Sequence, residues 1–181
     1  MLRWTFAILG AVVLAAGLLA FEPWRLFTSS EIDEPLPVSV AAPERGSRSP
    51  DGTGSTAPEP AEATEAPEVL ARGTFEAAEH DTSGSASVLR LADGRRFVRL
   101  EDLASSDGPD LHVWLSDRPS GGSWGSYDDG RSVALGGLKA THGNQNYEIP
   151  ADVSLAGLRS VVIWCDRFDV AFGTAPIRLE H

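Results

Sequence analysis

The chain has 181 residues, enough for one ordinary domain with length to spare, and its formal net charge is −11. Its few Lys and Arg side chains are spread out, so nucleic-acid binding, which needs several cations against phosphates, is not expected. The negative charge also argues against docking of the domain on anionic lipid. A single cysteine excludes an internal disulfide.

The first predicted element is a helix in the apolar segment 4–21, which carries no charged residue. At about 1.5 Å per residue it would span roughly 27 Å, close to the ~30 Å hydrocarbon core of a bilayer. Trp4 and Trp24 bracket the segment, as aromatic side chains do at membrane interfaces. Residues 1–27 are therefore predicted to be a single-pass anchor in the lipid bilayer of the cell membrane. The alternative is a cleaved signal peptide, whose apolar region is usually shorter.

The positive-inside rule places the N-terminus and Arg3 in the cytoplasm, so that the rest of the chain lies outside it. Residues 28–71 follow with nine acidic residues, two arginines and many prolines and alanines, but no aromatic residue. Such a composition buries too little apolar surface to offset the entropy of ordering. We expect a disordered acidic linker there.

Residues 72–181 are predicted to form the folded domain, because apolar residues alternate in short runs separated by turn residues. This pattern favours an all-β fold, an antiparallel β-sandwich of about eight to nine short strands. Asp93-Gly94 predicts a tight hairpin, and residues 118–130 read as one long flexible loop. The predicted strands are Gly73–Glu79, Ser85–Leu91, Arg95–Leu100, Leu111–Ser116, Val133–Lys139, Asn146–Ile149, Ser160–Cys165, Phe168–Phe172 and Pro176–Leu179.

Four blocks in this domain resemble the DM-thirteen domain, a family often labelled "electron transfer". They are Gly73-Thr74-Phe75 with His80 and Ser83-Gly84-Ser85-Ala86; Gly108-Pro109-Asp110-Leu111-His112-Val113-Trp114-Leu115-Ser116; Leu135-Gly136-Gly137-Leu138-Lys139 with Gly143-Asn144-Gln145-Asn146-Tyr147-Glu148-Ile149-Pro150; and Val161-Val162-Ile163-Trp164-Cys165 with Phe168, Val170, Phe172-Gly173 and Ala175. The resemblance implies a mainly β module of membrane-tethered or extracellular proteins, with a redox role centred on the cysteine after a tryptophan, here Cys165. Bacterial members commonly have an N-terminal helix, a linker and one domain, and the Arg- and Ala-rich composition fits a bacterial source.

The residues themselves leave three readings of Cys165 open: core packing, an intermolecular disulfide or redox chemistry. On a strand, Val161, Ile163 and Cys165 share one face while Val162 and Trp164 share the other, so the strand should be central and buried on both sides. Burial favours packing. An unpaired thiol outside the reducing cytosol, with Arg167 nearby, favours chemistry.

The working hypothesis is a redox or electron-transfer module with Cys165 as the active group, Trp164 as its neighbour and possible relay, and an unidentified protein or redox partner. The rival is a surface interaction module in which Cys165 only packs the core.

No cofactor or metal site is predicted. Candidates for non-covalent haem or copper are His80, His112 and His142, but their spacing is long, and surface histidines are the simpler reading. The motif Gly121-Gly122-Ser123-Trp124-Gly125 lacks the strand and helix of a hydrolase elbow. Asp128-Asp129-Gly130 lacks the alternating acids of a calcium loop. No enzymatic constellation is therefore expected.

Overall fold

The computed structural model describes residue 10, residues 29–39 and residues 65–178. In this part of the chain the elements with defined bounds are ten strands. They are β1 (Glu31–Asp33), β2 (Glu68–Thr74), β3 (Glu76–Ala77), β4 (Thr82–Arg90), β5 (Arg96–Ser105), β6 (Leu111–Ser116), β7 (Ser132–Gly137), β8 (His142–Ile149), β9 (Ser160–Cys165) and β10 (Val170–Pro176).

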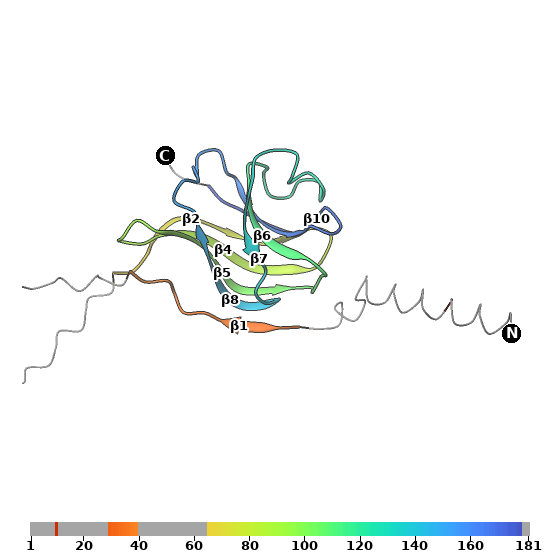
Figure 1. Cartoon of the computed structure of the whole chain (residues 1–181), viewed down its shortest axis with the longest axis horizontal. Coiled ribbons are helices and arrows are strands. Elements are labelled where there is room, and N and C mark those ends of the chain that lie inside the picture. Colours follow the sequence, from red (N-terminus) through yellow and green to blue (C-terminus); the bar gives the residue numbers. More distant parts are fainter. Residues whose placement is uncertain (1–9, 11–28, 40–64, 179–181) are drawn as a thin grey trace, which may run out of the picture.

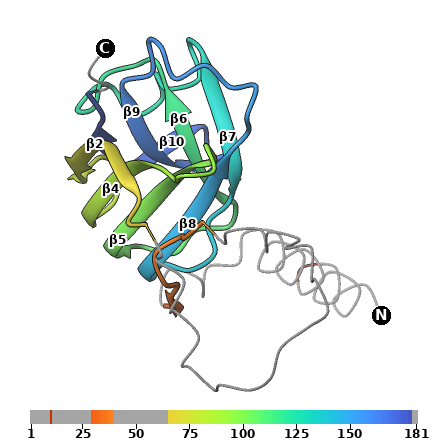
Figure 2. The same cartoon turned by 90° about the vertical axis from the view of Figure 1, so that its left-hand side faces the viewer.

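The strands form two five-stranded sheets that face one another (Figures 1 and 2). Sheet A has the order β1-β8-β5-β4-β2, and sheet B has the order β3-β10-β9-β6-β7. The predicted all-β, sandwich-like fold is confirmed. The prediction of a purely antiparallel fold is wrong at one edge, because β1 pairs with β8 in parallel. Parallel neighbours need a long connection between them, and more than a hundred residues separate β1 from β8.

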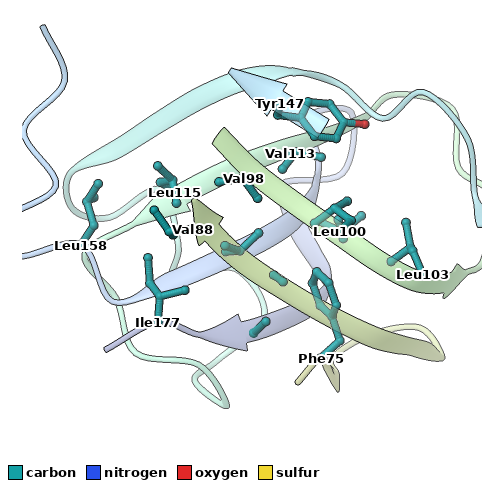
Figure 3. Packing of buried hydrophobic residues seen from close by; sticks show 14 of the residues in the cluster. Phe75, Val88, Val98, Leu100, Leu103, Val113, Leu115, Tyr147, Leu158 and Ile177 are labelled. Atoms are coloured by element: carbon teal, nitrogen blue, oxygen red, sulfur yellow. The ribbon is translucent and has the colours of Figure 1, made fainter. Parts of the chain in front are cut away.

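The main core fills the space between the two sheets (Figure 3). Strand β6 contributes Leu111, Val113 and Leu115 to this core. The residues between them, His112 and Trp114, point to the opposite face of the strand. Sheet A contributes Val88, Val98 and Leu100 to the same core. The alternation along each strand therefore determines which of its side chains lie on the outer face of the sheet.

Several strand boundaries differ from the prediction. The expected strand Gly73–Glu79 is two strands, since the chain leaves sheet A after β2, buries Phe75 and enters sheet B as β3. Of the expected strand Pro176–Leu179, Pro176 is the end of β10, Ile177 and Arg178 are not in a strand, and Leu179 lies outside the described residues. The Asp93-Gly94 hairpin is confirmed between β4 and β5, where Gly94 has a φ of 86° that glycine adopts without strain.

The predicted linker over residues 28–71 differs from the structure at both of its described ends. At one end β1 lies along β8, as Figure 1 shows, and at the other end β2 begins at Glu68. Strand β1 approaches Gly143 closely: this glycine has a φ of 96°, and a Cβ atom on it would overlap the carbonyl oxygen of Ile32. Amino-acid composition does not reveal β1, because the pairing of an edge strand uses backbone N–H and C=O groups, which all residues except proline supply in the same way.

Glu34, the residue after β1, binds this segment to sheet A and to Lys139. Its carboxylate accepts hydrogen bonds from Lys139 Nζ at 2.8 and 2.9 Å and from the backbone N–H of Asn146 at 2.7 Å. Arg99 Nη1 donates to the Glu34 carbonyl oxygen at 3.0 Å. Partial burial on its own would raise the pKa of Glu34, but these donors outweigh it and hold the pKa below its usual 4.5.

Acidification should therefore loosen the β1 segment before the rest of the domain unfolds. A carboxylate with a lowered pKa stabilises the folded state fully above pH 4.5, and this contribution is lost as the pH falls through the lower, folded-state value. Amide NMR signals of residues 31–34 should shift in that window below pH 4.5. In the Glu34→Gln variant the segment should already be loosened at pH 7, and the acid transition should be absent. A wild-type transition centred above pH 4.5 would contradict this assignment.

Among the described residues, no helix is both long and apolar enough to span a bilayer. The predicted span 4–21 lies outside the described residues except for Gly10.

Candidate functional site

Strand β9 lies at the centre of sheet B, between β10 and β6, and all six of its residues are buried. Val161, Ile163 and Cys165 belong to the main core. Val162 and Trp164 belong to a second, smaller cluster on the outer face of the sheet. The prediction of a central strand buried on both faces is confirmed. The side chains of Trp164 and Cys165 therefore lie on opposite faces of sheet B.

Cys165 is the last residue of β9, and its side chain has an exposed fraction of 0 %. It lies opposite Leu111 of β6 and Val170 of β10. The turn that follows β9 folds back beneath it, and Asp169 has a φ of 53° there. For this reason the predicted strand Phe168–Phe172 begins only at Val170, and Phe168 lies in the turn.

The surroundings of the Cys165 thiol raise its pKa overall. Burial raises its pKa above the usual 9.0 and keeps it protonated at neutral pH, while hydrogen bonds from the backbone N–H groups of Phe168, Arg167 and Asp110 act in the opposite direction. The negative charge of Asp110 adds to the upward shift. From the sequence, Arg167 was the nearby charged residue expected to favour thiol chemistry. In the structure Arg167 acts on the thiol through its backbone amide, and Asp110 is the opposing carboxylate.

Trp164 is 1 % exposed and stacks on Trp114 of β6, with ring centroids 4.9 Å apart and planes 25° from parallel. Tyr127, Val162 and Ala171 complete this cluster. Two aromatic rings in this arrangement gain attraction beyond their buried area.

The long loop after β6 covers the tryptophan pair and is folded around Tyr127. The Tyr127 hydroxyl donates to the Pro119 carbonyl at 3.2 Å and accepts from the Gly122 N–H at 3.0 Å. Ser116 Oγ donates to the Tyr127 carbonyl at 3.1 Å. Residues 118–130 were predicted to be a flexible loop, but in the structure they fold over the outer face of sheet B. The one tyrosine in this Gly/Ser-rich stretch, Tyr127, could have indicated that the loop packs on the domain.

The three histidines named as haem or copper candidates lie in different places. His80 follows β3 and contacts the ring of Phe172, with centroids 4.0 Å apart. His142 begins β8, and its Nδ1 lies 2.9 Å from Thr141 Oγ1. His112 is on β6. The structure does not bring them together around one centre, nor does it place any of them in a ligand group with Cys165.

His112 instead joins Asp110 and Asp166, and among the described residues this is the one group of three metal-ligating side chains whose ligand atoms lie within 4.8 Å of one another. Neither aspartate was predicted as a ligand. Asp110 immediately precedes β6 and is two residues from His112, a spacing that puts two side chains on one side of an extended chain. Asp166 joins them only through the pairing of β6 with β9. The group borders an open groove of about 580 Å³ lined by residues 107–112, residues 137–141 and Ser30.

Two exposed aromatic side chains lie near the turn that follows β9. Phe168, in the turn, is 49 % exposed, and Trp124, in the covering loop, is 50 % exposed. The Trp124 carbonyl accepts a hydrogen bond from the Ala171 N–H at 2.9 Å, which ties that loop to the start of β10. The buried thiol, the acid–histidine group and these exposed aromatic residues therefore gather around one turn.

Comparison with known proteins agrees with the resemblance seen in the four sequence blocks. The model of the family described as "Electron transfer DM13" matches residues 74–177, which include strands β3 to β10 and both residues of the Trp164-Cys165 pair. No curated protein and no solved structure matches the chain. Since the match extends over more than half of the sequence, the chain belongs to the Electron transfer DM13 family.

Proposed function

We propose that the protein is an electron-transfer module held outside the cytoplasm by a helix at residues 4–21, with Cys165 as its redox group and the Trp164–Trp114 pair beside it. The observation that carries the proposal is the position of Cys165, fully buried at the end of β9 and adjacent in the chain to the stacked Trp164–Trp114 pair. A thiol is a readily oxidised group, and burial leaves it open to electron transfer rather than to direct attack by another sulfur.

Burial limits the kind of chemistry that this thiol supports. Thiol–disulfide exchange requires one sulfur to attack another directly, and Cys165 has no exposed surface. Transfer of single electrons requires no such contact. In the forward step the thiol loses one electron to an oxidised one-electron carrier, such as a haem protein, and its proton to a base. The Asp110 carboxylate, whose charge acts on the thiol, is the base that we assign to this proton. One electron from a reduced carrier and return of the proton from Asp110 restore the thiol.

The test is one-electron oxidation of the purified full chain with a soluble metal-complex oxidant, followed by transient absorption and electron paramagnetic resonance. Wild-type protein should give a sulfur or tryptophan radical that decays when a one-electron reductant is added. Cys165→Ala should lose the sulfur radical and slow the reaction at least tenfold. Phe168→Leu, at an exposed position in the turn after β9, replaces a side chain that the oxidant does not attack, and this control should react like wild type. Equal rates for wild type and Cys165→Ala would remove Cys165 from the proposal.

Alkylation of the thiol is an independent check. Since burial both blocks access and raises the pKa, a small alkylating reagent should modify Cys165 only after urea unfolds the domain, even at pH 9. Rapid labelling of the folded protein would show an accessible thiol and would favour exchange chemistry instead.

A second candidate function is a surface interaction module in which Cys165 only packs the core. The exposed side chains of Trp124 and Phe168, both near the turn after β9, favour it. The two functions separate in the Cys165→Ala variant, which would keep partner binding in the second case. Replacing Trp124 and Phe168 by alanine would abolish that binding and leave the radical yield with a soluble oxidant unchanged.

A further inference from the structure

Two carboxylates and an imidazole converge at the end of sheet B where β6 begins and β9 ends. His112 Nε2 lies 3.0 Å from Asp110 Oδ1 and 3.4 Å from Asp166 Oδ2. One nitrogen thus faces both carboxylates. His112 is half-buried while the two aspartates are exposed, so the group opens to solvent on one side.

These separations suit ligands of one metal ion. Two atoms that each lie about 2.1 Å from an ion are about 3.0 Å apart when they subtend a right angle and about 3.4 Å apart at the tetrahedral angle. The two measured distances match these values. Imidazole nitrogen with carboxylate oxygen is a donor set of zinc and of manganese(II).

The backbone holds the three residues in place without an ion. His112 pairs with Trp164 in the ladder between β6 and β9, and the Asp166 N–H donates to the Asp110 carbonyl at 3.0 Å. His112 lies on β6, and the two aspartates lie in the turns directly before β6 and directly after β9. A divalent ion would also offset the repulsion between Asp110 and Asp166 in a chain that already carries a net charge of −11.

We propose that Asp110, His112 and Asp166 form a binding site for a divalent first-row transition metal, with zinc and manganese(II) as the best-matched ions. The three side chains occupy one side of the ion, and the remaining positions face solvent beside the groove at Gly137–Thr141. Water, or a small oxygen ligand that enters this groove, fills them. The site stands whether or not Cys165 carries electrons.

The first test is calorimetric titration of the full chain with zinc chloride. The second is titration with manganese(II) chloride, in which binding reduces the electron paramagnetic resonance signal of the free ion. Wild-type protein should bind one ion. His112→Gln and Asp166→Asn should each weaken binding at least tenfold. The controls His142→Gln and Asp152→Asn change the same residue types elsewhere on the surface and should stay within twofold of wild type.

Zinc should also shift the NMR signals of the His112 ring and leave those of His142 in place. Unchanged urea midpoints for the variants would show that they fold. Equal affinity in wild type and His112→Gln, an equal loss in the controls, or no saturable binding of either ion would each overturn the proposal, since diffuse attraction to an acidic chain predicts those outcomes. The radical yield of the Cys165 experiment is a separate readout, so failure of one proposal does not decide the other.

Discussion

Replacing Trp164 with alanine should lower the free energy of unfolding by about 4 kcal/mol, because truncation of a large buried aromatic side chain costs roughly 3–5 kcal/mol. The ring is 1 % exposed and lies between β9 and its cover, stacked on Trp114 and packed in one cluster with Tyr127. Its loss leaves a cavity that rigid neighbours on sheet B cannot fill. Urea unfolding of the full chain, followed by circular dichroism, measures the change.

The matched control is Trp124→Ala, because Trp124 is the same residue type at an exposed position in the covering loop. Exposed substitutions usually change stability by no more than about 0.5 kcal/mol. Trp164→Phe should restore most of the lost stability. A loss below about 1 kcal/mol for Trp164→Ala would mean that the loop does not pack on the sheet in solution.

Gln145→Leu should lower the free energy of unfolding by about 3 kcal/mol although it makes the interior more apolar. Gln145 is fully buried, and its amide bonds three groups: Nε2 donates to the Ala140 carbonyl at 2.7 Å, and Oε1 accepts from the Ala140 N–H at 3.3 Å and from the Tyr147 hydroxyl at 2.7 Å. Leucine removes the partner of both Ala140 groups and the acceptor of the Tyr147 hydroxyl, which keeps only the Lys139 N–H that donates to it at 2.9 Å. Each buried group left unpaired costs about 1–3 kcal/mol, and the apolar burial of leucine offsets part of that cost.

Glu148→Gln, at an exposed position on the same strand, is the control and should stay within about 0.5 kcal/mol of wild type. The Tyr147 hydroxyl offers a second readout, since burial raises its pKa to about 12. Loss of the Gln145 partner should move this titration, which ultraviolet absorbance follows. A Gln145→Leu variant as stable as wild type would contradict the buried network.

Parts of the molecule that depend on neighbouring residues in the chain could be predicted from the sequence. The run Val161–Cys165 is apolar at every position, and this identified β9 as central and buried on both faces. The hairpin at Asp93-Gly94 followed from local turn chemistry. Both rest on patterns only a few residues long.

What the sequence did not reveal depends on distant partners. Strand β1 has one apolar residue, Ile32, and owes its conformation to backbone pairing with β8. Tyr127 lies in a stretch of glycines and serines, and only the sheet beneath it makes it a core residue. Asp166 lies beside His112 because β9 pairs with β6 in a particular register. The pattern of residues within one strand does not determine which strand it pairs with or in which register.

The pairing of β1 with β8 limits the distance between the domain and the proposed membrane helix. Only residues 22–30 connect the proposed membrane helix to β1, and at about 3.3–3.6 Å per residue they reach no more than roughly 30 Å. Because β1 pairs with β8, the residues that follow β1 in the chain do not lengthen this connection. Under the proposed function, a carrier that exchanges electrons with this domain has to come within that distance of the membrane surface.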